Sequence, residues 1–265
     1  MSQLSLTALY RYPVKSLAGQ ALQTLSVDRR GPELDRHWML VDPQGRFLTQ
    51  RQHPRMVLIG TRFGAEGVLQ LQAPRMPDLD IAASSGDRLE VRIWGDTLFA
   101  ARVGDGADDW LRAFLGVPCH LVEQPGDVRR PVDPAFATPE DQVGLADGFP
   151  FLLISQASLN DLNDRLQTPL PMLRFRPNLV VAGCEPYAED GWRRIRIGDM
   201  VFRVAKPCSR CIIPTIDPDT GERGREPMQT LLSYRRRDNK VYFGQNLIHD
   251  GMGQLHLGMT VEVIE

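Results

Sequence analysis

The segment 206–222 holds the side chains best suited to chemistry. It places two thiols three positions apart, Cys208 and Cys211, with Arg210 between them and Lys206 just before them. Nearby cations stabilise a thiolate, which is both the nucleophilic form of cysteine and the form that binds metals. The turn signature 217–221 (Asp-Pro-Asp-Thr-Gly) follows and is expected to fold the chain back sharply.

Residue types alone leave four interpretations of the cysteine pair. A structural zinc site needs four ligands, and no second Cys or His pair follows at a suitable spacing. A redox-active dithiol belongs at the start of a helix in a βαβ unit. Two small buried side chains are the third interpretation. In the fourth, a single thiolate acts as a nucleophile or binds a soft metal whose other ligands come from a cofactor.

Side chains that could bind an anion occur in three further segments: Lys15 and Ser16, Arg36 and Arg51, and Arg176 and Asn178. The turn that ends at Gly19 is expected to expose the lysine and serine, and such a pair suits a phosphate. The two arginines of the second group stand at predicted strand edges. A guanidinium binds phosphate in a planar, bidentate manner, and an amide can both donate and accept. Taken alone, each group also fits a solvated surface charge, an ion pair or an ordinary turn.

The elements that must position these residues are predicted mainly as short strands, at 4–9, 38–41, 56–59, 68–71, 89–93, 151–154, 179–181, 194–197, 201–204 and 261–264. Helices are expected over 106–115 and 156–167, the second capped by Ser155, and a third near Pro227. Residues 124–150 are rich in Pro, Gly, Asp and Arg, which predicts a long and functional connection. The sum is a β-rich α+β fold, divided into domains 1–120 and 121–265, unless the first strands pack against the last ones.

Composition excludes several classes of protein. The 265 residues carry 31 basic and 33 acidic side chains, so the net charge of −2 gives no reason to propose a nucleic-acid or polybasic membrane partner. No run approaches the roughly 20 apolar residues that span a bilayer. The first residues lack the features of a secretion signal. We therefore expect a cytoplasmic protein with reduced thiols.

Several of these segments resemble one family in the same order along nearly the whole chain. Tyr12-Pro-Val-Lys-Ser16 and Asp35-Arg-His-Trp38 are similar to its N-terminal domain, whereas Phe175-Arg-Pro-Asn178, Cys208-Ser-Arg-Cys211 and Phe243-Gly-Gln-Asn246 are similar to the MOSC domain. This is the family of molybdenum-cofactor sulfurases and mitochondrial amidoxime-reducing components. The resemblance implies a mixed β domain over residues 1–120, followed by a MOSC β-barrel with a few flanking helices over 121–265.

The resemblance also implies roles for individual residues. Cys211 is implied as the protein ligand to molybdenum, and the role of Cys208 stays open. The pocket for the pyranopterin and its phosphate is implied to be lined by Lys15, Ser16, Arg36, Arg176, Asn178, Ser209 and Arg210, with Arg51 as a further member. For Asp217 two roles are open, positioning the substrate or capping the turn.

The activity implied by the resemblance is molybdenum-cofactor-dependent reduction of small N-hydroxylated compounds such as hydroxylaminopurines, hydroxylamines or amidoximes. Some bacterial relatives that detoxify hydroxylaminopurines carry a ferredoxin-like domain with four cysteines, and this sequence has no such cluster. We therefore expect no iron–sulfur cluster, and a separate reductase or electron-transfer protein as the electron source. Two rival hypotheses are a carrier of molybdenum cofactor, or of persulfide sulfur on Cys211, and a scaffold that binds nothing.

Overall fold

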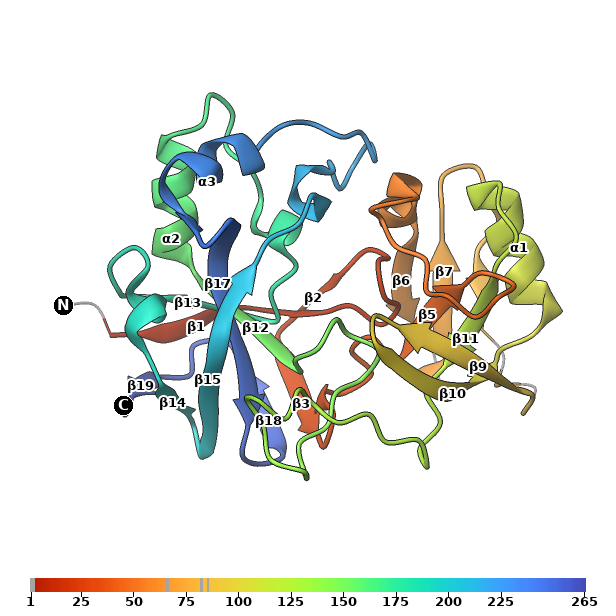
Figure 1. Cartoon of the computed structure of the whole chain (residues 1–265), viewed down its shortest axis with the longest axis horizontal. Helices are drawn as coiled ribbons and strands as arrows, with labels where there is room; N and C mark the ends of the chain where they lie inside the picture. The colour runs from red at the N-terminus through yellow and green to blue at the C-terminus, as the bar shows by residue number, and fades with distance from the viewer. Residues whose placement is uncertain (1–2, 65–66, 82, 85) are drawn as a thin grey trace.

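The computed structural model describes residues 3–64, 67–81, 83–84 and 86–265, and it confirms a β-rich α+β fold. Two halves lie side by side in Figure 1, one built mainly from the C-terminal part of the chain and one mainly from the N-terminal part. The first strand, β1 (Ser5–Arg11), nevertheless lies in the C-terminal half. No helix in the described ranges is long and apolar enough to cross a membrane.

The C-terminal half is a barrel built on one nine-stranded sheet. Its strands are β1, β2 (Gln20–Leu22), β12 (Phe151–Ser155), β13 (Leu179–Ala182), β14 (Arg194–Ile197), β15 (Met200–Ser209), β16 (Arg236–Arg237), β17 (Lys240–His249) and β19 (Val261–Val263). The order is β19-β14-β15-β17-β12-β13-β1-β2, with β16 beside β17. Backbone bonds from Leu6 N to Met259 O (2.9 Å) and from Val261 N to Leu4 O (2.9 Å) join the start of β1 to the segment that enters β19, so that the sheet closes on itself through β1.

The interior of this barrel is apolar because its strands alternate. In β14, Ile195 and Ile197 are fully buried whereas the two arginines between and before them are exposed. Leu6 and Leu9 of β1 belong to the same buried cluster. The first strand therefore packs against the last ones, the alternative that the sequence left open.

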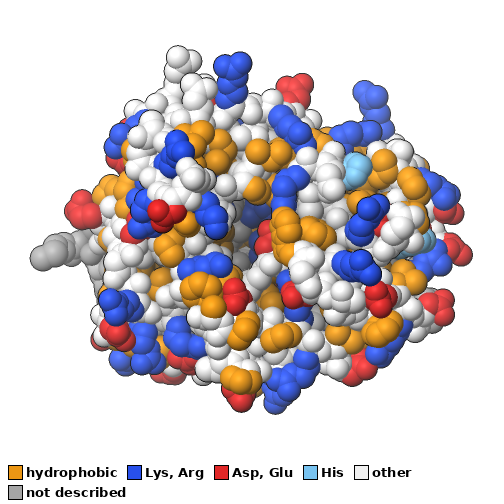
Figure 2. Space-filling model, in the orientation of Figure 1, with side chains coloured by type: hydrophobic (Ala, Val, Ile, Leu, Met, Phe, Trp, Pro, Cys, Tyr) orange, Lys and Arg blue, Asp and Glu red, His pale blue; other side chains and the backbone are white. Residues whose placement is uncertain are grey.

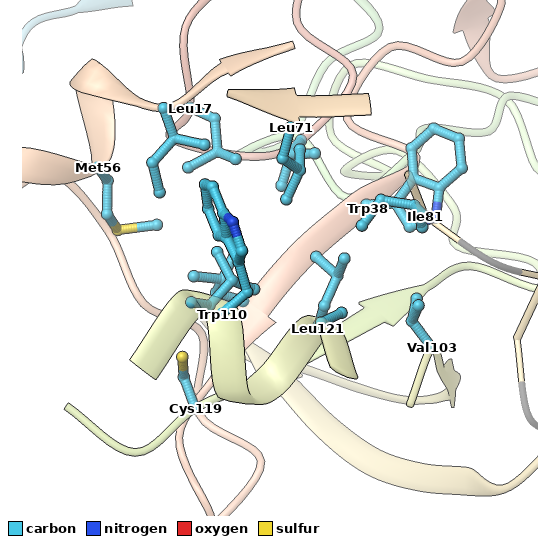
Figure 3. Close-up of a cluster of buried hydrophobic side chains, with 14 of the residues drawn as sticks. Leu17, Trp38, Met56, Leu71, Ile81, Val103, Trp110, Cys119 and Leu121 are labelled. Carbon is cyan, nitrogen blue, oxygen red and sulfur yellow. The ribbon is translucent and has the colours of Figure 1, made fainter. Parts of the chain in front are cut away.

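The N-terminal half contains two smaller sheets and one long helix. The sheet orders are β5 (Trp38–Val41)-β11 (His120–Glu123)-β10 (Asp96–Arg102)-β9 (Arg88–Ile93) and β6 (Gly60–Phe63)-β7 (Leu69–Gln72)-β8 (Leu79–Asp80). A third small sheet, β18 (Gly253–His256)-β3 (Thr24–Asp28)-β4 (Gly31–Pro32), packs Leu25, Val27 and Leu255 into the barrel core. Helix α1 (Asp105–Leu115) lies where the sequence predicts it. Figure 3 shows Trp110 projecting from α1 toward the strands, beside Leu71 and Leu17, in a buried cluster that centres this half.

Two further helices and several 3-10 turns complete the chain: α2 (Gln156–Asp164), α3 (Met228–Tyr234), η1 (Pro54–Leu58), η3 (Met172–Phe175), η4 (Ala188–Gly191) and η5 (Ile213–Thr215). Both helices pack on the barrel through a third apolar cluster that includes Leu159 and Leu231. Ser155 caps α2 as predicted, since its hydroxyl accepts a bond from Ser158 N at 3.0 Å.

Three predicted elements need correction. The run 56–59 is not a strand but lies at the 3-10 turn η1, which Pro54 opens at its first position. Helix α2 ends at Asp164, earlier than residue 167. Strand β15 extends from Met200 to Ser209, well past residue 204, because it pairs with β17, a strand that the sequence analysis did not predict. Cys208 thus lies on this strand.

Candidate functional site

One pocket between the two halves gathers nearly all the side chains that the sequence singled out. It is lined by Lys15, Ser16, Arg36, Arg51, Arg176, Asn178, Ser209, Arg210 and Cys211, together with Cys208. Figure 2 shows a hollow near the centre of the molecule, with Lys and Arg side chains in its walls. Asp217 stands outside this lining. The chain therefore brings together cations from segments more than 150 positions apart in sequence, between Lys15 and Arg176.

Three of these residues hold strained backbone conformations. Ser16 (φ 67°), Arg36 (φ 45°) and Arg176 (φ 56°) all lie in the left-handed region, which residues other than glycine seldom adopt. Arg176 ends the turn η3 there, directly before Pro177. Strain of this kind costs on the order of 1 kcal/mol or more for each residue and concentrates at functional sites.

Arg36 and Arg176 are held by one aromatic ring. Their guanidinium carbons lie 4.3 Å and 4.2 Å from the ring centre of Tyr12, so that both groups lie over the same ring. Arg36 also pairs with Asp35 at 2.5 Å, and Arg176 donates to the carbonyl of Leu17 at 2.7 Å. Burial lowers the pKa of Arg176 to about 10, and the charge of Arg36 adds to that effect.

Four guanidinium groups in the pocket keep a buried nitrogen atom without a hydrogen-bond partner among the described residues: Arg51 Nε, Arg174 Nε, Arg176 Nη2 and Arg210 Nη2. Leaving a buried donor unpaired costs about 1–3 kcal/mol, more when it is charged. Four such donors in one pocket therefore indicate a site for a multiply charged anion. The sequence analysis missed Arg174, although it stands only two positions before Arg176.

The sequence analysis also missed Asp147, which comes from the connection 124–150. Its carboxylate accepts from Lys15 Nζ at 2.5 Å, pairs with Arg51 at 3.5 Å and accepts from Trp94 Nε1 at 3.3 Å. Although partial burial acts to raise it, the neighbouring Lys15 and Arg51 hold the pKa of Asp147 well below its usual range. Nothing in the local sequence separates this aspartate from others in the same connection, such as Asp133.

Lys15 is buried, which corrects the expectation that the turn exposes it. Only 5% of its side chain is exposed, because the ammonium group is drawn back onto Asp147. Burial lowers the pKa of Lys15 to about 8, and Asp147 acts in the opposite direction. Ser16 is buried as well, whereas the side chain of Asp147 is 59% exposed.

The two thiols have different surroundings. Cys208 is half-buried on β15, and burial raises its pKa although Arg210 acts to lower it. Cys211 is exposed into the pocket, just before η5. Because it is the exposed thiol, Cys211 is the one open to a ligand. The ammonium group of Lys206, which precedes both thiols in the sequence, lies over the rings of Phe136 (4.6 Å) and Phe149 (5.1 Å).

Asn178 and Asp217 use their polar atoms within the protein. The amide of Asn178 accepts from Leu152 N (3.2 Å) and Arg36 (3.3 Å), and donates to the carbonyl of Tyr10 (3.2 Å). Asp217 accepts from the backbone N–H groups of Asp219 and Thr220 at 2.9 Å and 3.0 Å, and from Arg174 at 2.7 Å. The turn-capping role of Asp217 is thus present, and the same carboxylate orients an arginine of the pocket.

Comparison with known proteins gives two family matches. The MOSC N-terminal beta barrel domain matches residues 3–118, and the MOSC domain matches residues 140–262. The mitochondrial amidoxime-reducing component 1 of Homo sapiens is 37% identical over 97% of this chain and 82% of its own length. Component 2 of Rattus norvegicus is 34% identical over 97% and 82%. The molybdenum cofactor sulfurase of Oryza sativa subsp. japonica is 32% identical over 92% of this chain but 32% of its own length.

Proposed function

Since the chain belongs to the MOSC family, with a MOSC N-terminal domain ahead of the MOSC domain, we propose that it binds molybdenum cofactor and reduces small N-hydroxylated compounds. The observation that carries this proposal is the set of four unpartnered guanidinium nitrogens around a pocket that also exposes Cys211. The names of the amidoxime-reducing relatives support the choice of substrate.

The donor set fits such a cofactor. Guanidinium groups recognise a phosphate dianion in a planar, bidentate manner, and Arg51, Arg176 and Arg210 each keep a nitrogen free for it. Lys15 and Arg36 add charge to the same wall. A thiolate is the ligand that a soft metal prefers, and we propose Cys211 as the protein ligand to molybdenum.

When bound, the cofactor would supply two-electron oxygen-atom transfer. The balanced reaction is R–NHOH plus two protons and two electrons, giving R–NH2 and water. We propose that a separate electron-transfer protein supplies the electrons. The protein contributes binding and orientation through its cations. Cytoplasmic location stays a prediction, since the animal relatives are named as mitochondrial.

A second candidate function is delivery of the cofactor or of persulfide sulfur. The exposed thiol of Cys211 and the similarity to a molybdenum cofactor sulfurase favour it. Delivery requires that the bound group leaves the protein. Transfer of cofactor or sulfur to an acceptor enzyme, without reduction of hydroxylamines, would support this candidate over the reductase.

The decisive experiment is elemental analysis of protein purified from a host that makes molybdenum cofactor and from one that cannot. We expect near-stoichiometric molybdenum in the first preparation only, and reduction of an N-hydroxylated base by that preparation with an artificial electron donor. Absence of both molybdenum and pterin from the first preparation would overturn the proposal.

A further inference from the structure

The cationic pocket contains one acidic side chain. Among the residues that the structure describes, its lining includes Lys15 and five arginines but a single carboxylate, that of Asp147. A carboxylate repels a second anion, and the repulsion is stronger in a partly buried pocket than in water. Asp147 therefore opposes the binding of the multiply charged anion that the unpartnered guanidinium nitrogens indicate.

This carboxylate occupies two of the cations that an anion would use. Lys15 Nζ donates to one of its oxygens at 2.5 Å, and Arg51 Nη2 lies 3.5 Å from the other. The two ion pairs compensate the charges of Lys15 and Arg51. An incoming anion gains the full attraction of these cations only after the carboxylate has left them.

Asp147 can release both cations without movement of the backbone. Its side chain is 59% exposed, so water can hydrate the carboxylate once it turns away. The chain before it is fixed separately, because the buried Arg130 donates to the carbonyl oxygens of Gly144 at 2.9 Å and Ala146 at 2.5 Å. Rotation of the side chain to another staggered rotamer is therefore enough.

Asp35 is the opposite case. It pairs with Arg36, another arginine of the pocket, at 2.5 Å, but its side chain is only 3% exposed and also accepts from Tyr12 N at 2.7 Å. A carboxylate held in this way would leave a buried donor unpaired if it moved. Asp35 is thus a fixed partner of its arginine, whereas Asp147 is a displaceable partner of its two cations.

We propose that Asp147 is an internal competitor for anion binding, a carboxylate that occupies Lys15 and Arg51 and turns into solvent when an anionic ligand takes these cations. The inference goes beyond the proposed function, because it holds for any anion that enters the pocket and does not require molybdenum. The competition lowers the affinity of the pocket, since an anion has to replace two ion pairs. It also couples the pocket to the surface, because Trp94 is 57% exposed and its Nε1 donates to the same carboxylate at 3.3 Å.

The first test compares the affinity of wild type and Asp147→Asn for sulfate by calorimetry. It is made at pH 5.5, because removal of the carboxylate lowers the pKa of Lys15 and a low pH keeps the lysine cationic. We expect sulfate to bind about tenfold more tightly to Asp147→Asn, since one close repulsive charge is lost. The matched control is Asp133→Asn, which removes an exposed carboxylate of the same connection outside the pocket and should leave the affinity unchanged. Equal or weaker binding by Asp147→Asn, or no binding by either protein, would overturn the proposal.

The second test follows the displacement in wild type and needs no variant at the pocket cations. Indole N–H resonances of the isotope-labelled full chain are recorded by NMR during a sulfate titration, and that of Trp94 is assigned through Trp94→Phe. We expect this resonance to shift and to exchange faster with water as sulfate binds, because its acceptor leaves. The indole of Trp110, which donates to the carbonyl of Pro77 at 2.7 Å, is the control and should not change. A Trp94 resonance that stays constant at saturating sulfate would show that the carboxylate remains in place, against the proposal.

Discussion

At the scale of single residues, the two cysteines of the pocket predict opposite outcomes of the same substitution. Cys211 is exposed into the pocket, whereas Cys208 is half-buried with a raised pKa. We expect Cys211→Ala to fold normally and to lose its molybdenum, while Cys208→Ala retains it. Molybdenum per mole of protein, with circular dichroism as the check on folding, decides the point. Equal metal content in wild type and Cys211→Ala would refute the ligand assignment.

Lys15 predicts a pH dependence of anion binding. Burial lowers its pKa to about 8 in the ligand-free protein, so the side chain is cationic below that pH and neutral above it. An anion favours the cationic form. The dissociation constant for sulfate, which stays a dianion throughout, should therefore be flat below pH 8 and rise above it, toward the value of a protein that lacks the charge of Lys15. Calorimetric titration between pH 6 and pH 9, below the pKa of about 10 of Arg176, measures it.

Two variants test whether Lys15 is the titrating group. Lys15→Met should bind sulfate more weakly at neutral pH and lose the pH dependence. Asp147→Asn should shift the midpoint to lower pH, because the carboxylate of Asp147 raises the pKa of Lys15. A midpoint near pH 8 that persists in Lys15→Met would assign the titration to another residue.

At the scale of the elements, β17 approaches β12 closely at one glycine, Gly244, behind the pocket. Gly244 has φ 79°, and a Cβ there would lie 2.6 Å from Ile154 Cγ1 and 2.8 Å from the carbonyl oxygen of Leu153. Arg210, whose Nε donates to the carbonyl of Phe243, would have to move with the strand. We expect Gly244→Ala to lower the free energy of unfolding by about 3 kcal/mol, from backbone strain and from overpacking together.

Gly258 supplies the matched control for this substitution. It has a similar φ of 83°, but a Cβ there would meet nothing within 4 Å. Gly258→Ala should therefore cost only the backbone strain, about 1 kcal/mol. Urea unfolding of both variants measures the difference. Equal losses of stability would mean that the crowding against β12 contributes nothing.

The elements also show what the sequence could and could not predict. Strands β5 and β14 lie at the predicted residues, because their apolar runs have clear limits. Strand β17 escaped prediction since Gly244, Gln245 and Asn246 interrupt its apolar pattern, and it is formed by pairing with distant strands. Asp147 escaped for a similar reason: it meets Lys15 across 132 positions, a contact that no local pattern encodes.

At the scale of the whole molecule, the two halves should unfold together. β1 contributes Leu6 and Leu9 to the barrel core, and Arg223 donates to the backbone carbonyls of Gln50 and Arg51 across the pocket. The division at residue 120 stays a prediction, but a cut there would remove two strands, β1 and β2, from the barrel sheet. We expect a single calorimetric transition for the full chain, and no cooperative transition for residues 121–265 alone. Two separated transitions would contradict this coupling.

The clamp of Arg36 and Arg176 on Tyr12 has a consequence for the motion of the ring itself. Two guanidinium groups lie over the ring, Tyr12 is 1% exposed, and the ring edge leaves no room for a Cβ at Gly19. Rotation about the Cβ–Cγ bond must push these neighbours aside, which a close-packed interior resists. The two halves of the ring should therefore give separate proton resonances in NMR spectra. The temperature at which the two resonances merge would give the rate of ring rotation, and with it the rate at which the pocket wall opens.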